Sequence, residues 1–275
     1  MGSGALNIGL KALLTSQSAL DTVGHNLANA NTPGYSRQNL AVSTSSTVMI
    51  RGLLQGNGVQ ADVVKRTVDD LLEKRLLQQT SVMGRLDARA LGLAGAEALF
   101  GTGENAIEAK LRGLFASFGT LAGAPDDLTL RAGAVQSAVG LSTRFNQLST
   151  GLLGLGQDSV ARLKTHVSQV NQLTTQIVSL NKQISALEVG STSANDLRDT
   201  RDQALRELAE LVDTRVSENE RGAVRVLVGG QPVVTATEAQ KLIVTTASDG
   251  SLGPIRLDKS NADLNVTGGA IGGLI

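Results

Sequence analysis

The sequence predicts a mainly α-helical protein of the α+β class, in which long antiparallel, coiled-coil-like helices are followed by a small β domain. Three observations predict it. Apolar residues recur every three or four positions in several stretches of the first 212 residues, which is typical of helices that pack along a stripe. Beyond Asp213, apolar and polar residues alternate, as in strands. Aromatic residues make up only 2% of the chain, so aliphatic side chains must form the core.

A length of 275 residues is enough for about two domains. We predict a terminal axial segment over 1–60, a long-helix domain over 61–212 and the start of a β domain over 213–275. The terminal segment would combine a helix with an extended arm and depend on assembly. Because the last eight residues are glycine-rich and apolar, we expect the β domain to be truncated.

Composition also excludes several classes of function. The net charge is zero and no run of five like charges occurs, which argues against binding to nucleic acid. No stretch approaches the roughly 20 apolar residues that cross a bilayer, so membrane insertion is not expected. The N-terminus lacks the basic cluster of a cleavable signal. Export from the cell would therefore need another route.

The first predicted helix covers Ala5 to Ala30. Its apolar residues follow alternating spacings of four and three, with Gln17 and Gly24 as weak positions. A stripe this narrow buries little area by itself, so the helix should need a partner helix. The alternative is an ordinary amphipathic helix packed inside a domain. The predicted assembly interface is Leu6, Leu10, Leu13, Leu20 and Leu27.

A turn ends this helix, because Asn31-Thr32-Pro33-Gly34 combines proline with a glycine that tolerates positive φ. Extended chain is predicted from Leu40 to Val48, then a glycine-rich loop from Gly52 to Gly58. A short strand is predicted from Val59 to Val63, where apolar and polar residues alternate.

Three further helices are predicted. The first runs from Val64 to Leu121 and is interrupted at Gly101 and Gly103, since glycine destabilises helix interiors. Pro125, Asp126 and Asp127 mark the start of the second, which continues to Leu187 and carries a coiled-coil-like stripe from Leu163 onward. A loop over 190–193 leads to the third helix, over 194–212.

The β part is predicted from three segments. Val224 to Val228 and Val233–Val234 flank Gly229-Gly230, which indicates a hairpin. Further strands are expected over 242–246 and 255–257.

No catalytic, cofactor-binding or metal-binding residues are predicted, and the chain is not expected to be an enzyme. His25 and His166 are far apart and each lies on a helical pattern. Asp196, Asp199 and Asp202 share one side of a helix and could be metal ligands. Arginines lie between them, however, and an Asp202–Arg206 pair has the favoured i,i+4 order. A helix face of salt bridges is the preferred interpretation.

One stretch resembles a known family. Residues 5–38 read ALNIGLKALLTSQSALDTVGHNLANANTPGYSRQ, which is similar to the N-terminal signature of flagellar rod, hook and hook-associated proteins. The ending Pro-Gly-Tyr-Ser-Arg-Gln resembles the hook-associated protein at the hook-proximal junction most. Segments within 56–72 and 196–208 are also similar to that family. The family signature turn comprises Asn26, Asn29, Asn31, Thr32, Pro33, Gly34 and Tyr35.

The resemblance implies a structural component of the flagellum that joins hook to filament through helix packing between subunits. Its partners would be copies of itself, the hook subunit, a second junction protein and the export apparatus. The protein would lie outside the cell, exported by the flagellar type III route without a cleaved Sec signal, and would need no cofactor. The signature turn would connect inner and outer layers. The terminal helix would be mobile in the monomer and fold on assembly.

Two alternatives remain open. A rod or hook subunit is the nearest, although the long helix over 126–187 argues against it. A coiled-coil adaptor that binds through the stripe over 163–187 belongs to another class of function, but it leaves the N-terminal motif unexplained.

Overall fold

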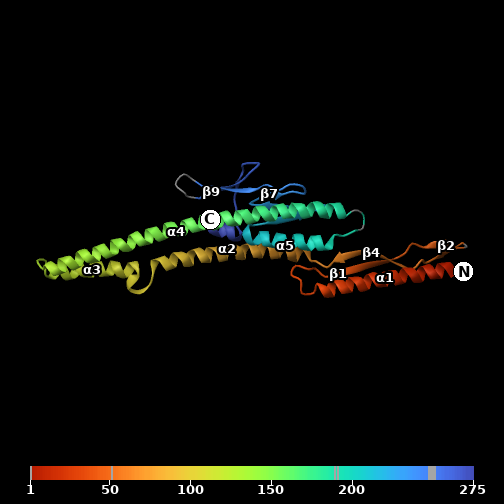
Figure 1. Ribbon diagram of the computed structural model, residues 1–275, viewed down its shortest axis with the longest axis horizontal. Helices are drawn as coiled ribbons and strands as arrows, with labels where there is room; N and C mark the ends of the chain where they lie inside the picture. Colours follow the sequence, from red (N-terminus) through yellow and green to blue (C-terminus); the bar gives the residue numbers. More distant parts are fainter. Residues whose placement is uncertain (1, 51, 189, 191, 247–251) are drawn as a thin grey trace.

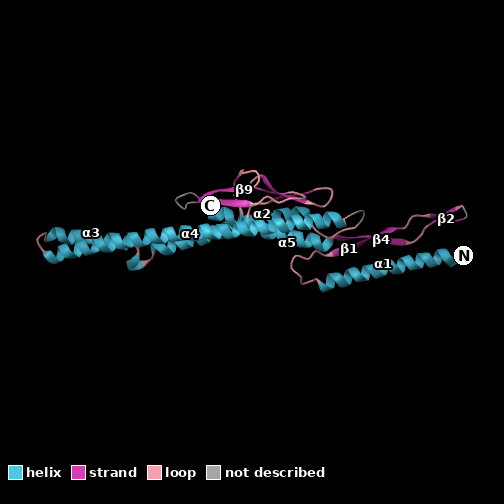
Figure 2. Cartoon of the chain, turned by 45° about the horizontal axis from the view of Figure 1, so that its top comes forward, coloured by secondary structure: helices cyan, strands magenta, loops and turns pink. Residues whose placement is uncertain are grey.

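The computed structural model describes residues 2–50, 52–188, 190, 192–246 and 252–275. The molecule is elongated: an N-terminal arm extends one end, a thin pair of helices forms the other, and a β-rich part lies on one side (Figure 1). Figure 2 separates the long helices from the small antiparallel sheets. The predicted α+β class is confirmed. Domain boundaries at residues 60 and 212 stay predictions.

The arm (residues 2–66) pairs one helix with two hairpin-like ribbons. Its elements are α1 (Gly2–Ala28), β1 (Gln38–Thr44), β2 (Val48–Ile50), β3 (Leu53–Gln55) and β4 (Val59–Arg66). β1 pairs antiparallel with β4, and β2 with β3. Two predictions were wrong here. The expected loop over 52–58 contains β3, and residues 64–66 belong to β4 rather than to a helix, because they continue the ladder opposite β1.

Three helices run along the molecule between the arm and the thin end (Figure 1). They are α2 (Asp70–Phe100), α3 (Ile107–Gly123) and α4 (Leu128–Leu187), with a short 3-10 helix η1 (Gly103–Asn105) between the first two. α2 begins where the Asp69 carboxylate accepts hydrogen bonds from two backbone N–H groups of the first turn, and Asp127 starts α4 in the same way. The predicted interruption is confirmed, since Gly101 and Gly103 have φ of 70° and 65°.

The rest of the body (residues 70–275) encloses the core. It contains α5 (Asn195–Leu211), β5 (Arg215–Glu218), β6 (Val224–Val228), β7 (Gln231–Val234), β8 (Leu242–Thr246), β9 (Leu252–Leu257), β10 (Asp263–Leu264) and α6 (Gly269–Leu274). The strands form two sheets, β5-β6-β7 and β10-β9-β8. The predicted hairpin and the strand over 242–246 are confirmed. β9 begins three residues earlier than expected, and β5 was missed because RVSE has no clear apolar alternation. Of the predicted loop over 190–193, residue 191 lies outside the described residues.

The stripe on the C-terminal half of α4 faces this core. Leu163, Val170, Ile177 and Ile184 are fully buried. Leu163, Val170 and Ile177 belong with residues of α5 and of both sheets to one packed interior. An adaptor that binds partners through this stripe is therefore ruled out, because the surface it would need is already covered.

Candidate functional site

α1 has two chemically different faces, and the predicted leucine stripe lies on the uncovered one. Its five leucines are between 53% and 77% exposed. None therefore has a covering partner among the described residues. The residues are Leu6, Leu10, Leu13, Leu20 and Leu27, and Leu14 and Val23 beside them are exposed as well.

The opposite face of α1 packs on β1 and β4 with small and polar side chains. Ile8 lies against Gly58 at the start of the β4 segment. The Lys11 ammonium donates a 2.8 Å hydrogen bond to the buried Ser45 hydroxyl. Half-buried positions on this face are Ala12, Thr15, Ser18, Ala19 and Thr22. The arm thus covers the face that offers little hydrophobic area and leaves the leucines open.

α2 shows the same division of faces. Its inner face has buried Leu77 and Ser81, and Gly84 lies directly against the backbone of Glu210 in α5. Its outer face carries a second heptad-like stripe with alternating spacings of four and three over almost the whole helix. Every member of this outer stripe is exposed: Leu72, Leu76, Gln79, Met83, Leu86, Ala90, Leu93, Glu97 and Phe100.

The signature turn consists of two successive backbone turns. The Thr32 N–H donates to the Asn29 carbonyl at 2.9 Å, and the Tyr35 N–H donates to the Thr32 carbonyl at 3.2 Å. Gly34 has φ of 83°, a conformation that glycine adopts without strain. Asn31 and Pro33 are exposed at the outside of the turn.

Asn26 connects the end of α1 to the strand that follows the turn. Its side-chain oxygen accepts hydrogen bonds from the Tyr35 hydroxyl and from the Gln38 N–H, both at 2.8 Å. Its side-chain NH2 donates to the Gln38 carbonyl at 2.8 Å. The Tyr35 hydroxyl also lies 3.0 Å from His25 Nδ1. Helix, turn and strand are therefore held by one asparagine, a role that spacing in the sequence could not reveal.

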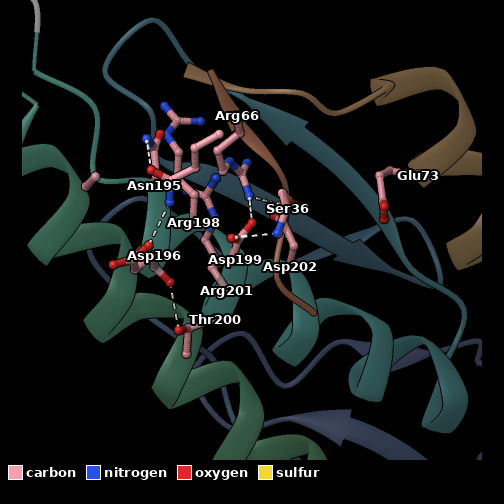
Figure 3. A network of polar contacts seen from close by, with 12 residues as sticks. Ser36, Arg66, Glu73, Asn195, Asp196, Arg198, Asp199, Thr200, Arg201 and Asp202 are labelled. Carbon is pink, nitrogen blue, oxygen red and sulfur yellow. Dashed lines mark hydrogen bonds and ion pairs between the residues drawn. The ribbon is translucent and has the colours of Figure 1, made fainter. Parts of the chain in front are cut away.

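The arm meets α5 in a polar joint (Figure 3). The Ser36 N–H donates to Asp199 at 2.9 Å, and the Gln38 amide donates to Asp196 at 2.9 Å. Asn195, at the start of α5, donates to the carbonyl of Val64 in β4 at 2.8 Å. The three stretches that resemble the family in sequence thus come together in space. A cleft of about 300 Å³ lies between the turn and α5.

Arg66, at the end of β4, is the central cation of this joint. Its Nη1 lies 2.7 Å from an oxygen of Asp199 and 2.7 Å from an oxygen of Asp202. The side chains of Arg66 and Asp199 are only 11% and 8% exposed. Burial lowers the pKa of Arg66, but the two carboxylates outweigh burial and leave it above the ordinary value. The guanidinium therefore stays charged and bridges two carboxylates one helical turn apart.

The other arginines of α5 make long-range pairs within the body. Arg198 forms a bidentate contact with Glu188, at 2.6 and 2.7 Å, and this contact lowers the pKa of Glu188. Arg201 is almost fully buried and its pKa is lowered by burial. The predicted Asp202–Arg206 pair was wrong: Arg206 pairs with Glu73 of α2 at 2.7 Å, since Asp202 faces Arg66.

The remaining polar candidates have ordinary partners. His166 lies 3.1 Å from the Gln169 side chain, and His25 lies near Tyr35. No cluster of three or more histidine, cysteine, aspartate or glutamate side chains suited to a metal ion occurs in the described part of the chain. Sequence reasoning missed Arg66 and Gln38 as functional residues, because their partners are more than 130 positions away.

The sequence is similar to those of known flagellar proteins. Residues 6–35 match the family of flagella basal body rod proteins. Flagellar hook-associated protein 1 of Bacillus subtilis is 28% identical over 93% of this chain and 50% of its own length. The Escherichia coli protein of the same name is 27% identical over 98% of this chain and 52% of its own length. The chain thus spans about half the length of the curated relatives it matches.

A solved structure is also similar. The flagellar hook junction protein FlgK from Burkholderia pseudomallei superposes with a TM-score of 0.63 and 25% identity, covering 75% of this chain and 38% of that one. Residues 93–275, more than half of the chain, match the helical domain of flagellar hook-associated protein FlgK. The chain belongs to the family of the flagellar hook-associated protein FlgK.

Proposed function

We propose that this chain is a structural component of the bacterial flagellum that joins hook to filament by packing helices between subunits. One observation carries the proposal: the arm covers the small-residue face of α1 and leaves its leucine stripe exposed. A soluble helix that turns its leucines outward along a heptad pattern is suited to burial against another helix.

The energy available is consistent with assembly. Full burial of one leucine contributes roughly 1.5–3 kcal/mol. The five leucines are 53% to 77% exposed, so covering their remaining exposed surface would contribute on the order of 5–10 kcal/mol before the cost of association. The outer stripe of α2 supplies a second surface of the same type. A mechanical role suits these surfaces, because they offer mainly apolar contact.

The proposal includes partners and location. Copies of the chain, the hook subunit and a second junction protein would supply the covering helices, and the export apparatus would deliver the protein outside the cell without a cleaved Sec signal. Membership of a flagellar family supports this location. None of the described helices is both long and apolar enough to cross a bilayer. The signature turn, from Asn29 to Tyr35, would connect the inner helix to the outer layers. An enzymatic role is not proposed.

The test replaces two leucines of the stripe by aspartate, Leu13→Asp and Leu20→Asp together, in a strain that lacks the chromosomal copy. The variant should fold and be exported but fail to hold filaments on hooks, because two charges would have to be buried at the helix seam. Filament attachment is measured by electron microscopy and swimming in soft agar.

A matched control places one aspartate at the exposed Gln172 of α4, outside both stripes. This control should keep filaments attached. Normal filaments with the double leucine variant would contradict the proposal. Thermal unfolding of both purified variants separates a loss of assembly from a loss of folding, since exposed leucines should hardly affect monomer stability.

A further inference from the structure

The arm and the body meet mainly where β4 contacts α5, while α1 packs within the arm on β1 and β4. Figure 1 shows α1 lying along the strands and away from the long helices of the body. Near the C-terminal end of α1, His25 Nε2 lies 3.9 Å from a carboxylate oxygen of Asp196 in α5. The direction in which α1 points is therefore decided where this end of the arm meets α5.

Hydrophobic packing does not hold this junction. Among the described residues, every buried hydrophobic side chain lies at Leu77 or beyond it, so the arm contributes none to the core. Gln38 and Ser45 are the buried side chains of the arm, and both are polar. Apolar contacts tolerate sliding, because they are non-directional, whereas hydrogen-bonded ion pairs require a particular geometry.

The start of β1 and the end of β4 both lie against carboxylates on one face of α5. Arg66, on β4, binds Asp199 and Asp202, and the Ser36 N–H just before β1 binds the second oxygen of Asp199. Residues 199 and 202 are three positions apart and so lie on the same side of the helix. A single guanidinium therefore connects the axis of β4 to the axis of α5 at two points one turn apart.

We propose that Arg66 is a positioning residue that sets the direction of the arm relative to the body. Without it, Asp199 and Asp202 would face each other as largely buried carboxylates with no cation between them. Leaving such charges unpaired is strongly unfavourable, and the two carboxylates regain solvent when β4 moves away from α5. The arm is then released as a unit, with its internal contacts intact. This inference concerns the isolated chain and does not depend on the proposed assembly function.

The experiment measures the distance between arm and body. The chain has no cysteine, so two introduced cysteines carry the only spin labels. Ser16→Cys on α1 and Gln176→Cys on α4 are both exposed sites. Pulsed electron paramagnetic resonance then gives the distance distribution in the otherwise unchanged chain, in Arg66→Ala and in Arg37→Ala. Arg37 is an exposed arginine of the arm close to the joint and controls for the change in charge.

The expected result is a narrow distribution for the unchanged chain and for Arg37→Ala, and a shifted, broader one for Arg66→Ala. Asp202→Asn, which removes the negative charge of one of the two carboxylates, should shift the distribution in the same direction but less. If Arg66→Ala does not fold, the distance distribution of Asp202→Asn tests the positioning role in its place. An Arg66→Ala distribution that matches the unchanged chain would overturn the proposal.

A second pair of labels, Ser16→Cys with Thr44→Cys, lies entirely within the arm. Its distribution should stay the same in Arg66→Ala. Broadening of this pair would mean that Arg66 holds the arm together internally, and the positioning role would be rejected.

Discussion

The body and the arm use similar helical stripes in opposite ways. In the C-terminal half of α4, the stripe residues Leu163, Val170 and Ile177 are fully buried against α5 and the sheets. In α1, a stripe with the same spacing is exposed, because small and polar residues face the arm instead. A heptad pattern therefore indicates an apolar surface that is suited to burial. The composition of the opposite helix face determines whether the same chain buries that surface.

The largest expected difference between the two regions is in hydrogen exchange. Amides over 163–187 should exchange at least about 1,000-fold more slowly than those of α1, since the first need global unfolding and the second only local opening. Mass spectrometry of the purified monomer, with peptides from both regions, measures this. Equal protection would show that α1 is already stabilised within the monomer, and the comparison would fail.

Truncation of a single side chain should lower the free energy of unfolding much more in the core of the body than on α1. Ile177→Ala removes a fully buried side chain from the core and should lower the free energy of unfolding by about 2–5 kcal/mol. Leu13→Ala, at an exposed position of similar hydrophobicity, should change it by no more than about 0.5 kcal/mol. Urea denaturation followed by circular dichroism compares the two. A large loss for Leu13→Ala would reveal a partner for the stripe within the chain.

Two glycines of α2 contrast a position in close contact with α5 and a position with open space around it. A methyl group at Gly84 would collide with the backbone of Glu210, so Gly84→Ala should destabilise by about 1–3 kcal/mol. Gly92 has no neighbour within 4 Å of such a group, and Gly92→Ala should stabilise by about 0.5–1 kcal/mol through helix propensity. Opposite signs in thermal unfolding are expected. Destabilisation by both would place Gly92 in a contact as well.

The last comparison tests electrostatics within the body. Glu188→Gln should cost about 1.5 kcal/mol at pH 7, because it removes a charged, bidentate partner of Arg198. The pKa of Glu188 lies below its usual 4.5, so its contribution is present above that value and is lost as the pH falls through the lower folded-state pKa. Urea denaturation near pH 7 and near pH 3 should show the difference shrinking in acid. A difference that does not change with pH would mean that packing, not charge, is responsible.

Much of the secondary structure followed from local chemistry. The break at Gly101 and Gly103, the start of α4 after Asp127 and the hairpin at Gly229-Gly230 all depend on residues within one or two turns of each other. β5 and the continuation of β4 to Arg66 escaped prediction, because a strand is defined by its neighbour in the sheet and short segments carry little signal of their own.

The candidate site was predictable only in part. The leucines that the spacing grouped are all exposed on α1, and their role as an assembly interface stays a prediction. Backbone turns lie between Asn29 and Tyr35, where the sequence placed a turn. The spacing of the outer stripe of α2 is present in the sequence, but the sequence does not show that this stripe is exposed. Which carboxylate each arginine binds could not be read, and the one pair that was predicted, Asp202–Arg206, does not form.

The sequence by itself determined that long helices form, that they are interrupted at Gly101 and Gly103, that α4 begins after Asp127, and which helical residues share a face. Helical periodicity and end capping act over only a few residues. Only the tertiary structure decided which face of α1 and α2 is covered, and that Arg66 joins β4 to α5. Those outcomes depend on contacts between segments that are distant in sequence, 34 residues apart for Lys11 and Ser45 and 136 for Arg66 and Asp202. A charged side chain within reach of several partners pairs according to the geometry that packing leaves available.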